Sequence, residues 1–172
     1  MSIRDSPGPN PSKPTYTDMG AVLSDDEEYR YQLWRTWDED KPTAGFIMVN
    51  PSTADATKDD RTISRCATFA NGMGFGKIIV ANLFAVRSSN PSIIEDHPNP
   101  IGPENDEHLM AVCEEAERHF AAWGTTGGKY ERAREVANLI DESLYALMTS
   151  KHGHPRHPSR IPYDISVKSF SY

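Results

Sequence analysis

A short run of apolar residues, 45–49, ends abruptly at Asn50-Pro51-Ser52-Thr53, and this arrangement constrains the fold more than any other stretch of the chain. An unbroken apolar run of this length between turn residues is typical of a strand that is covered on both faces. Polar side chains follow the run immediately, and the loops beyond the carboxyl ends of parallel strands are where α/β proteins bind ligands. We therefore expect residues 44–49 to form a central strand and the loop after them to contact a ligand.

Similar apolar runs recur along the chain and alternate with segments of helical periodicity. This alternation predicts parallel βαβ units with right-handed crossovers. Residues 29–37 instead alternate apolar with polar side chains, which is typical of a half-exposed antiparallel edge strand. We expect an α/β fold, namely a three-layer α/β/α sandwich with a central, mostly parallel four-stranded sheet plus an antiparallel edge strand. The other expected strands are 19–23, 77–84, 119–123 and 144–148, and the expected helices are 59–73, 104–117 and 130–141.

The length of 172 residues suits one domain with one core. We expect residues 1–18, which are rich in proline and serine, to be a flexible arm or an extended tail over the surface. Residues 19–165 then form a single α/β domain, and 166–172 form a C-terminal tail. No apolar run approaches the roughly 20 residues of a membrane-spanning helix, and the N-terminus lacks the apolar stretch of a secretory signal. We expect a cytoplasmic protein with no membrane partner.

Asparagines end two neighbouring strands of the expected sheet, Asn50 after the first and Asn82 after the second. An amide side chain donates and accepts hydrogen bonds at once, which suits it to reading the edge of a nucleobase. Phe84 is close enough in sequence to stack on such a base. The alternative is that both amides only satisfy backbone groups at the strand ends. The third strand ends at Trp123-Gly124, in a turn over residues 124–128, and residues 90–105 form a long proline-containing loop.

Residues 151–160 form the one dense basic cluster of a chain whose net charge is -7. This overall charge argues against sequence-independent binding to duplex DNA. The cluster carries the histidines 152, 154 and 157 with Lys151, Arg156 and Arg160, among them His154 and His157 as candidate site residues. Its prolines restrict the backbone, so the loop is suited to binding an anion such as phosphate. A histidine metal site completed by Asp55 or Asp60, or a plain surface loop, are the alternatives.

The chain resembles the domain of unknown function 1643 family of bacterial and phage proteins over residues 21–159. The resemblance rests on the segments 29–38, 50–62, 82–84, 122–124 and 153–158, that is YRYQLWRTWD, NPSTADATKDDRT, NLF, AWG and GHPRHP. The family name implies no activity.

The order of the motifs is also similar to that of the uracil-DNA glycosylase superfamily. This resemblance implies that Asn50-Pro51 positions a water, that Asn82 reads the base, and that a histidine of the His-Pro loop, His154 or His157, faces the base and phosphate. The chain departs from that pattern in two places, because acidic residues replace the expected aromatic after Asn50-Pro51, and the C-terminal loop carries an inserted Arg-His. These departures put duplex DNA as the substrate in doubt.

Together these residues predict a protein that recognises a nucleotide, or a nucleic acid with an accessible base, and hydrolyses an N-glycosidic bond of a modified or damaged base. Asn50, helped by Asp55 or Asp60, is expected to position or activate a water, and His154 or His157 to stabilise charge on the departing base. The alternatives are a nucleotide-sequestering protein without chemistry and a metal-dependent nucleotide hydrolase. We expect no cofactor or metal and leave the oligomeric state open. The expected substrate-binding residues are Pro51, Ser52, Thr53, Asn82, Phe84, Arg87, Trp123, Gly124, Lys151, Arg156 and Arg160.

Overall fold

The computed structural model describes residues 3–140 and 142–172. Over these residues the chain forms one mixed sheet of seven strands with five α-helices and one 3-10 helix. The predicted α/β class is confirmed. The strands are β1 (Asp18–Leu23), β2 (Arg30–Thr36), β3 (Thr43–Met48), β4 (Lys77–Asn82), β5 (Arg118–Ala121), β6 (Leu144–Ala146) and β7 (Lys168–Phe170).

The strand order in the sheet is β1-β2-β4-β3-β5-β6-β7. Strand β3 pairs in parallel with β4 and β5, and β5 pairs in parallel with β6, so these strands end at the same edge of the sheet. Strands β1, β2 and β4 pair antiparallel, as do β6 and β7. The apolar runs that predicted strands are buried on both faces, as in Phe46, Ile47, Ile79 and Val80.

Two parts of the sheet differ from the expectation. The segment expected to form an edge, β2, lies inside the sheet between β1 and β4, because β1 pairs along its whole length with β2 and covers its outer side. Residues 166–172, expected to be a tail, contain β7, which extends the sheet beyond β6. In both cases the extra pairing satisfies backbone groups that an edge strand leaves unpaired.

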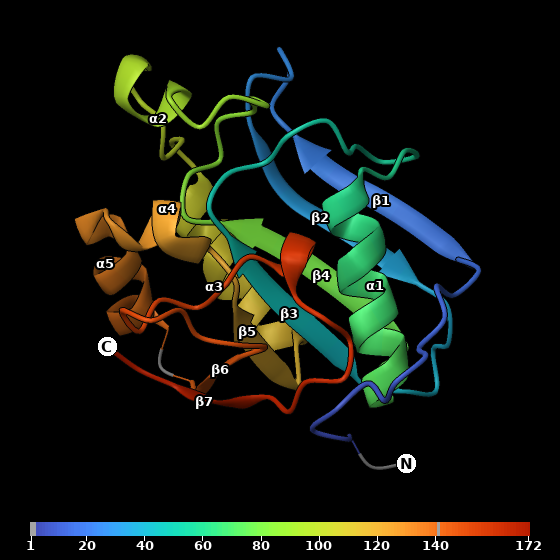
Figure 1. The fold of residues 1–172 in the computed structure, drawn as a ribbon. Helices are drawn as coiled ribbons and strands as arrows, with labels where there is room; N and C mark the ends of the chain where they lie inside the picture. Colours follow the sequence, from blue (N-terminus) through green and yellow to red (C-terminus); the bar gives the residue numbers. More distant parts are fainter. Residues whose placement is uncertain (1–2, 141) are drawn as a thin grey trace.

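Helices cover both faces of the sheet (Figure 1). Helix α1 (Arg61–Met73) packs against the face that presents Phe46 and Val80, whereas α3 (Asn105–Glu115) and α5 (Glu131–Leu139) share the core on the opposite face. Helix α1 begins after Asp60, whose carboxylate accepts a hydrogen bond from the backbone N–H of Ile63, and it ends at Gly74 with φ of 98°. Both residues suit these positions, because Asp is a favoured N-cap and glycine adopts positive φ without strain.

Three short helical segments occur where loops or turns were expected. They are α2 (Ile93–Asp96), within the proline-containing loop, α4 (Gly124–Gly128), and a 3-10 turn η1 (Pro158–Arg160). Helix α4 packs closely on its neighbours, since a Cβ on Gly127 would lie 2.6 Å from the Cβ of Trp123 and one on Gly128 would lie 2.1 Å from Nδ1 of His154. The glycines of this segment therefore permit close packing rather than only a turn.

The N-terminal segment lies over the surface beside the C-terminal end of α1 (Figure 1). The backbone N–H of Arg4 donates to the carbonyl of Met73 over 2.8 Å, and the Tyr16 hydroxyl donates to Asp59 over 2.6 Å. Both contacts tie the segment to the ends of α1. Among residues 3–140 and 142–172, no helix is long and apolar enough to cross a membrane.

Candidate functional site

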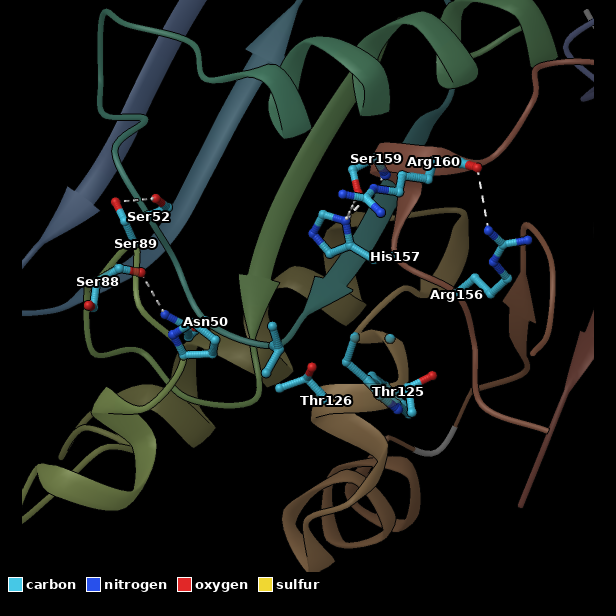
Figure 2. Close-up of a pocket in the computed structure, with 14 residues that line it drawn as sticks. Asn50, Ser52, Ser88, Ser89, Thr125, Thr126, Arg156, His157, Ser159 and Arg160 are labelled. Carbon is cyan, nitrogen blue, oxygen red and sulfur yellow. Dashed lines mark hydrogen bonds between the residues drawn. The ribbon is translucent and has the colours of Figure 1, made fainter. Parts of the chain in front are cut away.

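Two adjacent hollows lie where the carboxyl ends of β3, β4 and β5 meet the His-Pro loop. The first, which we call the outer cavity, has a volume of about 550 Å³ (Figure 2). The second, which we call the inner recess, has a volume of about 70 Å³ and is bounded on one side by Asp60, Thr62 and Ile63 at the N-terminus of α1. The two share Asn50, Ser52 and His157. The outer cavity is lined by Val49, Asn50, Ser52, Ser88, Ser89, Pro91, Trp123, Gly124, Thr125, Thr126, Arg156, His157, Ser159 and Arg160. The inner recess is lined by Arg30, Met48, Asn50, Pro51, Ser52, Asp60, Thr62, Ile63, Asn82 and His157.

Asn82 lies at the bottom of the site and is 1% exposed. It ends β4 and points to the same face as Val80, toward α1, because side chains two residues apart in a strand share a face. Neither the nitrogen nor the oxygen of its amide has a hydrogen-bond partner in the part of the chain that the structure describes. A buried polar group without a partner is rare and costs about 1–3 kcal/mol. The amide lines the inner recess, where a ligand can supply both missing partners.

Asn50 links the loop after β3 to the loop after β4. Its side-chain nitrogen donates to the carbonyl oxygens of Pro51 and Ser88, each over 3.1 Å (Figure 2). Because an amide nitrogen can donate only two hydrogen bonds, these contacts set the orientation of the group. The side-chain oxygen makes no hydrogen bond among the described residues, so it can accept one from a water or a ligand in either hollow.

His157 lies between the two hollows, and Figure 2 shows its ring pointing into the outer cavity. Its Nδ1 accepts a hydrogen bond from the backbone N–H of Ser159 over 3.2 Å. Burial lowers the pKa of His157 below its ordinary value, and the nearby Asp60 carboxylate opposes this shift. The neutral ring therefore carries its proton on Nε2, which gives the site a hydrogen-bond donor.

Arg30 is a residue of the inner recess that the sequence did not indicate. It begins β2, is 3% exposed, and donates from Nη1 to the carbonyl of Ala54 over 3.0 Å, while its Nε has no partner among the described residues. Burial lowers its pKa to about 10, with Asp60 opposing the shift, so the group stays cationic at neutral pH. None of the ion pairs within the described chain includes Arg30. An unpaired buried cation favours an electron-rich group in the recess.

Of the three acidic residues that follow Asn50, Asp60 lines the inner recess, whereas Asp55 and Asp59 make contacts that hold the loop before α1. Asp55 accepts hydrogen bonds from the backbone N–H groups of Thr57 and Lys58, which hold its pKa below the ordinary value. Asp59 pairs over 2.8 Å with Arg35, which is fully buried and also donates to the Asp55 carbonyl. Asp60 lines the recess and caps α1 at the same time. Asp55 lines neither hollow, and its carboxylate is engaged within its own loop.

Six predicted site residues line neither hollow, namely Asp55 and five others. Phe84 packs in the core on the α3 face, and Arg87 makes its hydrogen bond with the turn before β2. Thr53 and Lys151 are exposed. His154 lies against α4, with its Nδ1 3.4 Å from the Tyr172 hydroxyl. The other predicted residues all line one hollow or both: Asn50, Pro51, Ser52, Asp60, Asn82, Trp123, Gly124, Arg156, His157 and Arg160.

Hydroxyl groups from the loop after β4 and from α4 complete the outer cavity. Ser88 and Ser89 follow β4, Thr125 and Thr126 belong to α4, and Oγ of Ser89 lies 3.1 Å from Oγ of Ser52 (Figure 2). The sequence indicated these segments but not these side chains. Within the described residues, no group of three or more His, Cys, Asp or Glu side chains is arranged to hold a metal ion.

The fold and the site define an α/β protein with two adjoining hollows at the carboxyl edge of the parallel part of its sheet. A family model described as "Protein of unknown function (DUF1643)" matches residues 30–159, and the chain belongs to this family. The match confirms the family resemblance found in the sequence, and it runs from Arg30 to Ser159, which includes every residue that lines the inner recess. The comparison with curated proteins and the comparison with solved structures each returned no match.

Proposed function

We propose that this protein recognises the base of a nucleotide and hydrolyses its N-glycosidic bond. The observation that carries the proposal is the buried amide of Asn82, which has no partner among the described residues and lines a recess together with Asn50 and His157. A base presents donors and acceptors on one flat edge, and an amide with both of its functions free is complementary to such an edge. A base bound there supplies the hydrogen bonds that the buried Asn82 amide lacks in the protein alone.

The chemistry requires a positioned water and stabilisation of the departing base. The side-chain oxygen of Asn50 is free to accept a hydrogen bond from a water, because the nitrogen already donates to two carbonyls. Negative charge that develops on the base is stabilised by the Nε2–H of His157 and by the guanidinium of Arg30. Donors held in a buried site need little reorganisation during the reaction, which is why they are effective there.

The order of the motifs supports a fold of the uracil-DNA glycosylase type, with the inner recess as its base pocket. Under this proposal His157, which lines both hollows, is the histidine that faces the base, and His154 supports α4. The expected partner is a nucleotide or a strand with an accessible base, and the expected location is the cytoplasm.

A second function, binding without hydrolysis, is favoured by one feature of the site. The carboxylate that lines the recess, Asp60, already accepts the capping hydrogen bond of Ile63, and Asp55 is engaged in its own loop. A hydrolytic enzyme that relies on a strong general base keeps such a group free to accept a proton. A nucleotide-sequestering protein has no such requirement.

The test separates the two functions in one experiment. The purified protein is incubated with free nucleotides and with single-stranded oligonucleotides carrying modified bases, and released base and intact bound ligand are measured separately by chromatography. Base release that is lost in Asn82→Leu and kept in Asn138→Ala, an exposed amide on α5, supports hydrolysis. Intact retention with the same dependence on Asn82 supports sequestration. If neither released base nor bound ligand is detected, both functions are refuted.

A further inference from the structure

The outer cavity differs in charge from the rest of the molecule. The chain contains 25 Asp and Glu residues against 18 Lys and Arg, yet the described lining of this cavity includes Arg156 and Arg160 and no acidic side chain. An acidic protein that excludes carboxylates from one cavity creates a local positive potential there. The ligand of the outer cavity is therefore expected to be an anion.

The two arginines are held by the His-Pro loop without a carboxylate partner among the described residues. The backbone N–H of Arg156 donates to the carbonyl of Met148 and that of Gly124 donates to the carbonyl of Pro155, each over 2.8 Å, so the loop is tied to both neighbouring segments. Arg35 and Arg132, by contrast, each pair with a carboxylate. Arg156 donates from Nη1 to Sδ of Met148 over 3.0 Å and from Nη2 to the carbonyl of Arg160 over 3.4 Å, both uncharged acceptors, so the positive charge of the two arginines is not neutralised within the described chain.

The other polar groups of the cavity suit a phosphate. Side-chain hydroxyls of four residues line it; Figure 2 shows those of Ser88 and Ser89 across the cavity from the arginines and those of Thr125 and Thr126 along the side formed by α4. Phosphate oxygens accept hydrogen bonds from both guanidinium and hydroxyl groups, and arginine binds them in a paired geometry that adds specificity.

We propose that the outer cavity binds the phosphate of a nucleotide whose base occupies the inner recess. This inference rests on the proposed function, and it narrows the ligand to a phosphorylated nucleoside instead of a free base or an unphosphorylated nucleoside. The two hollows share Asn50, Ser52 and His157, so one molecule can span them with its sugar beside these residues. A cavity of about 550 Å³ lies within the size range of small-molecule sites.

Binding measurements on the complete chain test this inference. Calorimetry compares nucleosides with their 5′- and 3′-monophosphates, with inorganic phosphate, and with a short single-stranded oligonucleotide. We expect a monophosphate to bind at least about tenfold more tightly than its nucleoside, and Arg160→Gln to remove most of this advantage, because charge-assisted hydrogen bonds to phosphate are lost. Lys129→Gln removes the same charge from an exposed position beside α4 and serves as the matched control. A short strand that binds still more tightly shows that the phosphate comes from a polymer.

The possible failures are distinguishable. Nucleosides that bind as tightly as their monophosphates, or an advantage that survives Arg160→Gln, overturn the phosphate assignment and leave base recognition intact. Inorganic phosphate that binds through Arg160, without measurable binding of any nucleoside or nucleotide, overturns the proposed base recognition instead. If no ligand binds at all, both proposals are refuted.

Discussion

Replacing Asn82 with leucine is expected to stabilise the protein while abolishing ligand binding. The side chain is 1% exposed, and neither amide atom has a hydrogen-bond partner among the described residues. Leucine has the same branching as asparagine and carries no polar atoms, so Asn82→Leu removes a desolvation penalty of about 1–3 kcal/mol. In a chain of this size about 1 kcal/mol corresponds to roughly 2–4 °C in melting temperature.

The neighbouring buried asparagine supplies the matched comparison. Asn105 is also fully buried, but its side-chain nitrogen donates to the carbonyls of Asn82 and Leu83 over 2.9 and 3.1 Å. Asn105→Leu removes this donor from the Asn82 carbonyl, whereas the Leu83 carbonyl still accepts from Nε of Arg132 over 2.9 Å, and it also removes Oδ1 of Asn105, which has no partner among the described residues. The net effect expected is a destabilisation of about 1 kcal/mol. Both variants replace a buried asparagine with leucine at the end of β4, and we expect the free energy of unfolding to rise in one and fall in the other.

Urea unfolding followed by circular dichroism measures both effects. The midpoint should rise for Asn82→Leu and fall for Asn105→Leu, with the slope of the transition unchanged, since a changed slope reports a different unfolded or native state. A midpoint that falls in Asn82→Leu refutes the reasoning, because it means that the amide already has good partners in the unliganded protein.

Three further predictions concern the groups around the recess. Arg35→Met is expected to lower the free energy of unfolding by about 3 kcal/mol, since the Asp59 carboxylate loses its buried partner and keeps only the exposed Lys13 as a counter-ion, and urea unfolding measures the loss. Asp60→Ala should cost about 1 kcal/mol through loss of the α1 cap, and an unchanged urea midpoint contradicts this. The pKa of His157 is lowered in the folded state, so the unfolded chain binds more protons than the folded one as pH falls below about 6.5. Its contribution to stability is therefore present above that pH and is lost as pH falls through the folded pKa, and His157→Gln should reduce the decline in urea midpoint between pH 7 and 5.

Much of the fold follows from patterns that are local in the sequence. The buried strands β3 and β4 are visible as unbroken apolar runs, and the ends of α1 are marked by Asp60 and Gly74. The place of β2 in the sheet is not visible, because its alternating pattern is compatible with an edge, and only the pairing with β1 makes it internal. Local sequence patterns thus indicate where strands and helices form better than they indicate which strands pair.

The site was predictable where it depends on strand ends. Asn50 and Asn82 meet because the carboxyl ends of β3 and β4 lie side by side. Which histidine of the His-Pro loop enters the site depends on the packing of α4, whose glycines leave room for His154 away from the cavity. The contribution of Arg30 depends on a contact between β2 and the loop after β3, 24 residues further along the chain, which no local pattern encodes.

The central claim, that the recess takes a base and the outer cavity its phosphate, is tested most directly by a structure of the protein with a bound nucleoside monophosphate. We predict that the edge of the base lies about 3 Å from both amide atoms of Asn82, at hydrogen-bond distance, with the phosphate beside Arg160. A ligand that leaves the Asn82 amide without a partner, or one whose phosphate enters the recess beside Arg30, contradicts the account.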